Sequence, residues 1–242
     1  MKKTLLVLIA AFLSTMHLDA QDQTIHFNPK GERNIKIHLK NSNVTVVGSD
    51  NTDIVITASK EGGAATDQAN QDLKVENNDN ELNISKISED KYTYVIKVPR
   101  KVNIYFEEEF REPDKIVISD IEGKIQVKSW VSAIVLMKVT GPVDASSNAA
   151  DISVDFSSLD PQAANTITSL GRAVNITLPA NAKADLNLDV QSGKVTSDFD
   201  LGVENKEALY QVGSVRTIHS KINGGGTEIN IKANEITIRR KN

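Results

Sequence analysis

The stretch IVISDIEGKIQVKSWVSAIVLMKVTGPVDASSNAADISVDFSSLD, residues 116–160, decides the fold. It divides into five nine-residue units, which begin at Ile116, Ile125, Ile134, Val143 and Ile152, and the first and third residues of every unit are apolar. Side chains two residues apart lie on the same face of a strand. Nine residues make two and a half helical turns, so a helix would separate these pairs. Each unit therefore predicts one short strand with one buried face.

The sixth position of a unit is often apolar as well and is expected to turn inward after a bend. Ile121, Trp130 and Val139 hold this position in the first three units. Gly, Asn, Asp and Ser at the unit ends supply turn chemistry. The same spacing of apolar residues recurs less regularly in Ile35/Ile37, Val44/Val46 and Ile54/Ile56, and in Leu73/Val75 followed by Leu82/Ile84 and Ile87.

Strands this short cannot bury a face alone, but stacked coils share one continuous apolar core. Two units make a coil of about 18 residues. The pattern predicts an all-β fold, a β-solenoid or β-helix of short stacked strands. The alternative is a β-sandwich built from the same strands, because periodicity does not give strand direction.

The N-terminal segment, from Met1 to Ala20, has the pattern of a secretory signal peptide. Lys2 and Lys3 form a basic start, TLLVLIAAFL (residues 4–13) is an apolar run, and Ala20 is a small residue before the polar Gln21. The apolar run is well below the ~20 residues that span a bilayer as a helix. We expect cleavage near Ala20, a mature single domain over residues 21–242, and a location in the periplasm or at the cell surface.

Composition excludes several classes of protein. Cys is absent, so the chain offers no thiolate metal site, no disulfide and no lipid acceptor at the cleavage site. The net charge is −4 with both signs interspersed, and aromatic residues make up only 5% of the chain. A nucleic-acid partner is not expected, because that function needs clustered positive charge. No cofactor is predicted.

Four segments carry a resemblance to a known family. They are HLKNSNVTVVGSDNTDIVITA (38–58), SSNAADISV (146–154), LPANAKADLNLDVQSGKVTSDF (178–199) and INGGGTEINIKANEITIRRK (222–241). In their order and spacing they resemble the bacterial putative-adhesin family, exported β-strand-repeat proteins common in Bacteroidetes. The family's serine-x-glycine-aspartate turn survives as Gln191–Lys194 and is altered at residues 148–151 and 232–235. The resemblance implies a β-helical fold and an envelope location.

No catalytic constellation is visible. His26, His38 and His219 lie far apart and outside any HExxH spacing, and no GxSxG motif is present. Gly224–Gly226 precedes a strand and predicts a tight turn, since a phosphate loop would need a helix after it. We therefore predict that the chain is not an enzyme. The alternative is a carbohydrate-active lyase or hydrolase on a β-helix, which would need two carboxylates facing each other in a cleft.

The segment from Tyr92 to Asp114 concentrates aromatic and acidic residues. The alternate aromatics are expected to pack inward, with the acidic run as a solvated loop. A second interpretation is a weak calcium or glycan loop, because calcium binds six to eight oxygens and aromatics beside carboxylates suit sugars. Its candidate residues are Tyr105, Glu107, Glu108, Glu109, Glu112 and Asp114.

The outward positions of the repeat suggest a partner-contact patch. If successive units alternate between two faces, Val117, Val135 and Met137 project from the same one, whereas the other face shows Gln126 and Lys128. Stacked exposed apolar side chains suit a contact. The sequence thus favours a non-catalytic envelope protein, an adhesin-like binding module or scaffold with a rigid β face. Its partner would be an envelope glycan, a protein or a second copy of the chain.

Overall fold

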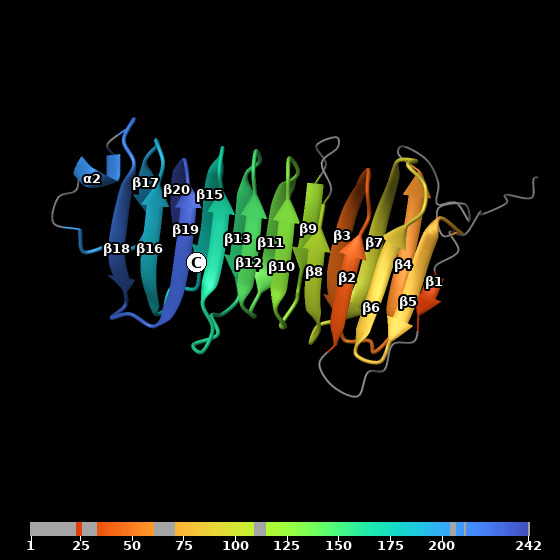
Figure 1. Cartoon of the computed structure of the whole chain (residues 1–242). Coiled ribbons are helices and arrows are strands. Elements are labelled where there is room, and N and C mark those ends of the chain that lie inside the picture. Colours follow the sequence, from red (N-terminus) through yellow and green to blue (C-terminus); the bar gives the residue numbers. More distant parts are fainter. Residues whose placement is uncertain are drawn as a thin grey trace, which may run out of the picture.

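The computed structural model describes residues 23–25, 33–60, 71–108, 115–203, 207–210 and 212–241. The strands of this part of the chain form two large, mostly parallel sheets, and α2 (Glu207–Tyr210) is a short helix of one turn (Figure 1). In spatial order, sheet A holds β1 (Gln23–Ile25), β4 (Ile54–Lys60), β7 (Tyr92–Pro99), β3 (Ser42–Ser49), β9 (Lys115–Ser119), β11 (Ala133–Val139), β13 (Ile152–Phe156), β15 (Ala173–Leu178), β20 (Glu235–Arg240) and β17 (Val195–Ser197). Sheet B holds β18 (Arg216–Ile222), β16 (Ala184–Val190), β19 (Thr227–Ala233), β14 (Asn165–Ser169), β12 (Val143–Ser147), β10 (Ile125–Ser129), β8 (Asn103–Glu107), β2 (Asn34–His38), β6 (Glu81–Lys86) and β5 (Leu73–Asn78).

Consecutive strands from β8 to β15 alternate between the two sheets and pair in parallel with the next strand but one. Ile134 pairs with Ile116 on one side and with Ile152 on the other, so each return to the same sheet takes two units of the repeat. The nine-residue register is therefore confirmed. The return is longer between Ile152 and Val174, because the Pro-containing connector is inserted there.

The core lies between the sheets and is filled by the first and third residues of the units. Ile125, Ile134 and Ile152 are fully buried, as are the sixth-position residues Ile121 and Val139. This stripe of β-branched side chains from both sheets forms one continuous cluster. Burial of so many apolar side chains is the main stabilising contribution in a chain without disulfides.

Two sixth-position expectations are wrong. Trp130 is 51% exposed, because Ser129 holds the inside of that turn, where its hydroxyl oxygen accepts from the backbone N–H of Ser132 at 2.8 Å. Ile87 is 68% exposed, because Lys86 turns inward instead and donates from Nζ to the Lys40 carbonyl oxygen at 2.8 Å. In both turns the inward position satisfies backbone polar groups, which an apolar side chain cannot do.

The same spacing also occurs in antiparallel strands. β5 and β6 form an antiparallel hairpin, with Asp79 at a φ of 40° in its turn, and β4 runs antiparallel to β7. β18 is likewise antiparallel to β16 at the other end. Antiparallel strands thus lie at both ends of a parallel stack, a direction that period-two spacing does not reveal.

The chain order inverts at both ends of the stack. β2 and β3 lie inside it, between β6/β7 and β8/β9, and β19 and β20 lie between β14/β15 and β16/β17. The C-terminus therefore lies in the body of the stack rather than at its end (Figure 1). Gly224 and Gly225, each with a φ of 89°, form the turn from β18 into β19, as expected. Among the described residues, no helix has the length and apolar character needed to cross a membrane.

Candidate functional site

The outer face of sheet B carries two short rows of polar side chains. Lys36 of β2, Tyr105 of β8 and Gln126 of β10 are in register and form the first row. His38, Glu107 and Lys128, two residues further along the same strands, form the second, with Glu107 and Lys128 in register. These six residues, with Phe106, line a depression of about 250 Å³. We call the six residues the Tyr105 site.

The backbone of the Tyr105 site is fixed by its position in the sheet. β2, β8 and β10 each pair with a strand on both sides, so their backbone groups are bonded throughout. Neighbouring strands lie about 4.8 Å apart, and side chains on one face repeat about every 7 Å along a strand. The array is therefore compact and preorganised. Tyr105 projects outward because Ile104 and Phe106 on either side of it point into the core.

Two contacts orient the first row. The Lys36 ammonium lies 2.7 Å from a Glu81 carboxylate oxygen, and the pKa of Glu81 is lowered mainly by this hydrogen bond. The Lys124 ammonium lies 5.9 Å from the centre of the Tyr105 ring, within the range of a cation–π contact. Within the described part of the chain, the side chains of Gln126, Lys128 and Glu107 make no hydrogen bond or ion pair. Their bonding capacity is available to a ligand.

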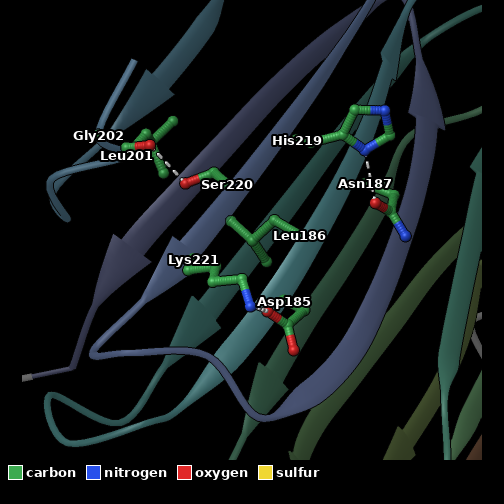
Figure 2. Close-up of a pocket in the computed structure, with 8 residues that line it drawn as sticks. All are labelled: Asp185, Leu186, Asn187, Leu201, Gly202, His219, Ser220 and Lys221. Atoms are coloured by element: carbon green, nitrogen blue, oxygen red, sulfur yellow. Dashed lines mark hydrogen bonds and ion pairs between the residues drawn. The ribbon is translucent and has the colours of Figure 1, made fainter. Parts of the chain in front are cut away.

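A second depression lies at the β18 edge of sheet B, and some of the polar side chains that line it bond to one another. It measures about 420 Å³ and is lined by Asp185, Leu186, Asn187, Leu201, Gly202, His219, Ser220 and Lys221 (Figure 2). Figure 2 shows His219 against Asn187, with 2.8 Å between Nδ1 and Oδ1, and Lys221 against Asp185, with 3.4 Å between Nζ and Oδ1. The Ser220 hydroxyl donates to the Leu201 carbonyl oxygen at 2.6 Å. His219, Ser220 and Lys221 thus each have a partner here, although Asp185 Oδ1 accepts no hydrogen bond among the described residues.

A third depression, of about 440 Å³, lies beside the Pro-containing connector and has no carboxylate or imidazole in its lining. The Tyr105 site contains one carboxylate, Glu107, and the second depression contains one, Asp185. A glycosidase needs two carboxylates flanking the scissile bond. The lining residues of these three depressions form no such pair. The described residues also contain no group of three or more His, Asp or Glu side chains placed to hold a metal ion.

The predicted calcium or glycan loop is divided by the structure. Tyr105 and Glu107 lie together in the Tyr105 site, whereas Glu108 turns away toward the β10–β11 turn. There Ser129 Oγ donates to Glu108 Oε2 at 2.6 Å, and Ser132 Oγ donates to Oε1. Glu109, Glu112 and Asp114 lie outside the described residues. Calcium binding by the loop stays a prediction. The inward aromatics of the interpretation are found, since Tyr92, Tyr94 and Phe106 are buried.

The predicted partner-contact patch lies on sheet A. Val117 and Val135 are opposite each other on one rung and are half-buried. Met137, 41% exposed, lies on the neighbouring rung of the same β9–β11 pairing, opposite Ser119. The rung of Val117 continues through Thr45 to Val95. Partner contact at this patch stays a prediction.

No family model matches the sequence, and no curated protein is significantly similar to it. Three solved structures are similar over most of the chain. A "putative cell adhesion protein" from Clostridium sporogenes has 15% identity and a TM-score of 0.47, and the match covers 91% of this chain and 99% of that one. A "putative adhesin" from Bacteroides fragilis has 12% identity and a TM-score of 0.36, covering 91% and 96%. Another from Parabacteroides merdae has 12% identity and a TM-score of 0.37, covering 92% and 96%.

Sequence reasoning found Tyr105 and Glu107 but did not group them with Lys36, His38, Gln126 or Lys128. The repeat did place Gln126 and Lys128 on an outward face. It gave no register for Ile104 of β8, which pairs with Ile125 of β10 on one side and with Ile35 of β2 on the other. Neither separation along the chain is a multiple of nine. The strand register within residues 116–160 was predicted from the nine-residue count, and that count does not apply to these pairs.

Proposed function

We propose that this chain is an exported, non-catalytic, adhesin-like module that binds an envelope ligand through the Tyr105 site. The single observation that carries the proposal is the depression in which Glu107, Gln126 and Lys128 lie beside the outward ring of Tyr105 and, within the described part of the chain, make no side-chain hydrogen bond or ion pair. Binding sites combine a concave surface with a few polar groups aimed at the ligand. On β16 and β18 of the same sheet, by contrast, His219 bonds Asn187 and Lys221 pairs with Asp185.

The scaffold we propose is a β-solenoid formed by one domain over residues 21–242. The alternation of β8 to β15 between the sheets, with a parallel partner at every second strand, supports this winding. Neighbour-only pairing makes such a stack stiff along its length. A stiff face suits recognition because little conformational entropy is lost on binding.

Export is part of the proposal, and the basic start, apolar run and Ala20 of the N-terminus support it. The signal segment lies outside the described residues. Mass spectrometry of the producing cell's envelope or culture fluid should find a mature N-terminus at or near Gln21. Recovery of the intact chain beginning at Met1 from those fractions would contradict export by this route.

Binding through the Tyr105 site is tested with purified residues 21–242 and washed envelope of the producing bacterium. Sedimentation of the protein with the envelope should occur for the wild type and be lost on Tyr105→Ala. His219→Ala, on the same face of sheet B, is the matched control and should sediment like the wild type. Unchanged sedimentation of Tyr105→Ala, with melting temperature as in the wild type, would remove the proposed function.

A further inference from the structure

We infer that the Tyr105 site takes a neutral, extended, β-linked oligosaccharide that lies across the strands of sheet B. This inference rests on the proposed function, since it names the ligand class of the same site. The argument uses the aromatic ring, the mixture of hydrogen-bonding groups, the charge balance and the spacing of the strands.

Tyr105 supplies the apolar element that a sugar needs. Its ring stands on the outer face of the sheet between Lys36 and Gln126, half-exposed. One face of a pyranose ring presents mainly C–H bonds, which stack well on an aromatic ring. Tyr combines such an apolar body with a polar tip, so it can contact the sugar ring and a hydroxyl together. Lys124 limits the orientations of the ring.

The polar groups around the ring include both donors and acceptors. Lys128 can only donate, the Glu107 carboxylate can only accept, and the Gln126 amide does both. A sugar hydroxyl donates one hydrogen bond and accepts others, so it is satisfied best by such a mixture. A phosphate or sulfate group would need donors alone, and the Glu107 carboxylate would repel it.

The charges of the site also balance. Lys36 is paired with Glu81 at 2.7 Å, and Glu107 and Lys128 lie opposite each other on adjacent strands. On the next strand, Asp144 is in register with Gln126. An anionic polymer would not be attracted to the site, because the site has no net positive charge. A neutral polymer does not depend on such attraction.

The direction of the ligand follows from the spacing of the rungs. Adjacent strands are about 4.8 Å apart, close to the advance per sugar of a fully extended β-1,4-linked chain. The polar row continues beyond Gln126 through Asp144 to Thr166, and beyond Lys36 to Asn83. Successive sugars can therefore meet equivalent polar positions on successive strands, with Tyr105 holding one of them.

The experiment titrates the protein by calorimetry with three hexasaccharides. β-1,4-Mannohexaose is neutral and extended, β-1,4-mannuronate hexamer has the same linkage with a carboxylate on each sugar, and maltohexaose is neutral but coiled. We expect measurable binding of mannohexaose and at least about tenfold weaker binding of the other two. Tyr105→Ala should weaken mannohexaose binding about tenfold or more, and Tyr105→Phe should retain most of it. His219→Ala is again the control, and melting temperatures confirm that each variant is folded.

The outcomes separate the ligand class from the proposed function. Equal or tighter binding of the mannuronate hexamer would overturn neutrality, and equal binding of maltohexaose would overturn the extended geometry. If no sugar binds while sedimentation with the envelope still depends on Tyr105, the ligand class is wrong and the proposed function stands. If sedimentation itself does not depend on Tyr105, the proposed function fails and this inference fails with it.

Discussion

Three serines close the turns of sheet B in the same way. Ser129, Ser147 and Ser169 end β10, β12 and β14, are buried, and lie opposite one another across the strands. Each hydroxyl oxygen accepts from the backbone N–H three residues later, at 2.8 to 3.1 Å. A buried N–H without such a partner is costly, so the repeat depends on these serines as well as on its apolar positions.

Replacement of Ser147 by Ala is expected to destabilise the protein by about 1–3 kcal/mol, because the Ala150 N–H loses its acceptor. Ser146, the outward neighbour on the same strand, should tolerate Ala within about 0.5 kcal/mol. Urea unfolding of both variants provides the comparison. Equal free energies of unfolding for the two would show that the buried hydroxyl has no structural role.

Tyr94 of β7 differs from these serines, because its buried hydroxyl has no hydrogen-bond partner among the described residues. Its side chain is fully buried. Burial is the largest cause of a strongly raised pKa for this phenol, with repulsion by Asp72 second. Tyr94→Phe removes an unsatisfied polar group and should stabilise the protein by about 1 kcal/mol at pH 7.

The raised pKa gives this prediction a pH signature. An unfolded tyrosine ionises near pH 10, while the folded Tyr94 keeps its proton to higher pH. Stability is thus retained below about pH 10 and falls as the pH rises above it, because only the unfolded chain releases the proton. The advantage of Tyr94→Phe should therefore grow between pH 9 and about pH 11. A constant difference in unfolding free energy across that range would contradict the assignment.

The strands show how far sequence reasoning reaches. In residues 116–160 the nine-residue count predicted which side chains are buried and which units share a sheet, because period-two alternation and equal spacing fix both. Trp130 and Ile87 were mistaken, since a turn can be closed from inside by serine or lysine. Strand direction and the register of β2, β8 and β10 depend on contacts between residues far apart in the sequence. The nine-residue spacing gives no information about such contacts.

The predicted partner-contact patch on the outer face of sheet A can be tested by substitution. If the patch of Val117, Val135 and Met137 contacts a partner or a second copy, Val117→Lys with Val135→Lys should abolish that association. Melting should change little, because both side chains point outward from the sheet. Ser153→Lys, on the same rung, is the matched control. Sedimentation velocity and thermal melting are measured together.

Two results would count against the patch. A large loss of stability on the double substitution would show that another part of the chain covers the valines and that they belong to the core. Unchanged association and unchanged melting would show that sheet A makes no contact there. Association lost from the Ser153→Lys control as well would indicate a general effect of added charge.

The whole molecule is a stack, and its sheet B ends in an antiparallel strand at both edges. β5 and β18 lie at the two edges of sheet B, where unpaired backbone groups would otherwise invite another chain. Thr217, His219 and Lys221 point outward from β18, and the polar and charged side chains of β5 include Lys74 and Glu76. Polar edges of this kind discourage strand addition. The two edges of sheet B are therefore poor sites for the addition of another strand.

Chain termini usually fray, but this stack predicts the reverse for β20. Its Ile236 and Ile238 are fully buried, and the strand is paired with β15 on one side and with β17 on the other. The edge strands β5 and β18 each pair on one side only. Because a local opening breaks fewer hydrogen bonds at an edge, amides of β5 and β18 should exchange faster than those of β20.

Hydrogen–deuterium exchange with peptide-level mass spectrometry measures this order directly. Peptides covering residues 235–240 should be protected nearly as well as those covering 134–136 of β11, and peptides covering 73–78 should exchange first. Loss of Ile238 packing should remove this protection, so Ile238→Ala is expected to accelerate exchange in β20 and in its neighbours β15 and β17 before it reaches β11. Thr237→Ala, outward on the same strand, should leave the order unchanged. Rapid exchange of residues 235–240 in the wild type would mean that β20 is not seated between β15 and β17, and the inverted chain order at this end of the stack would be wrong.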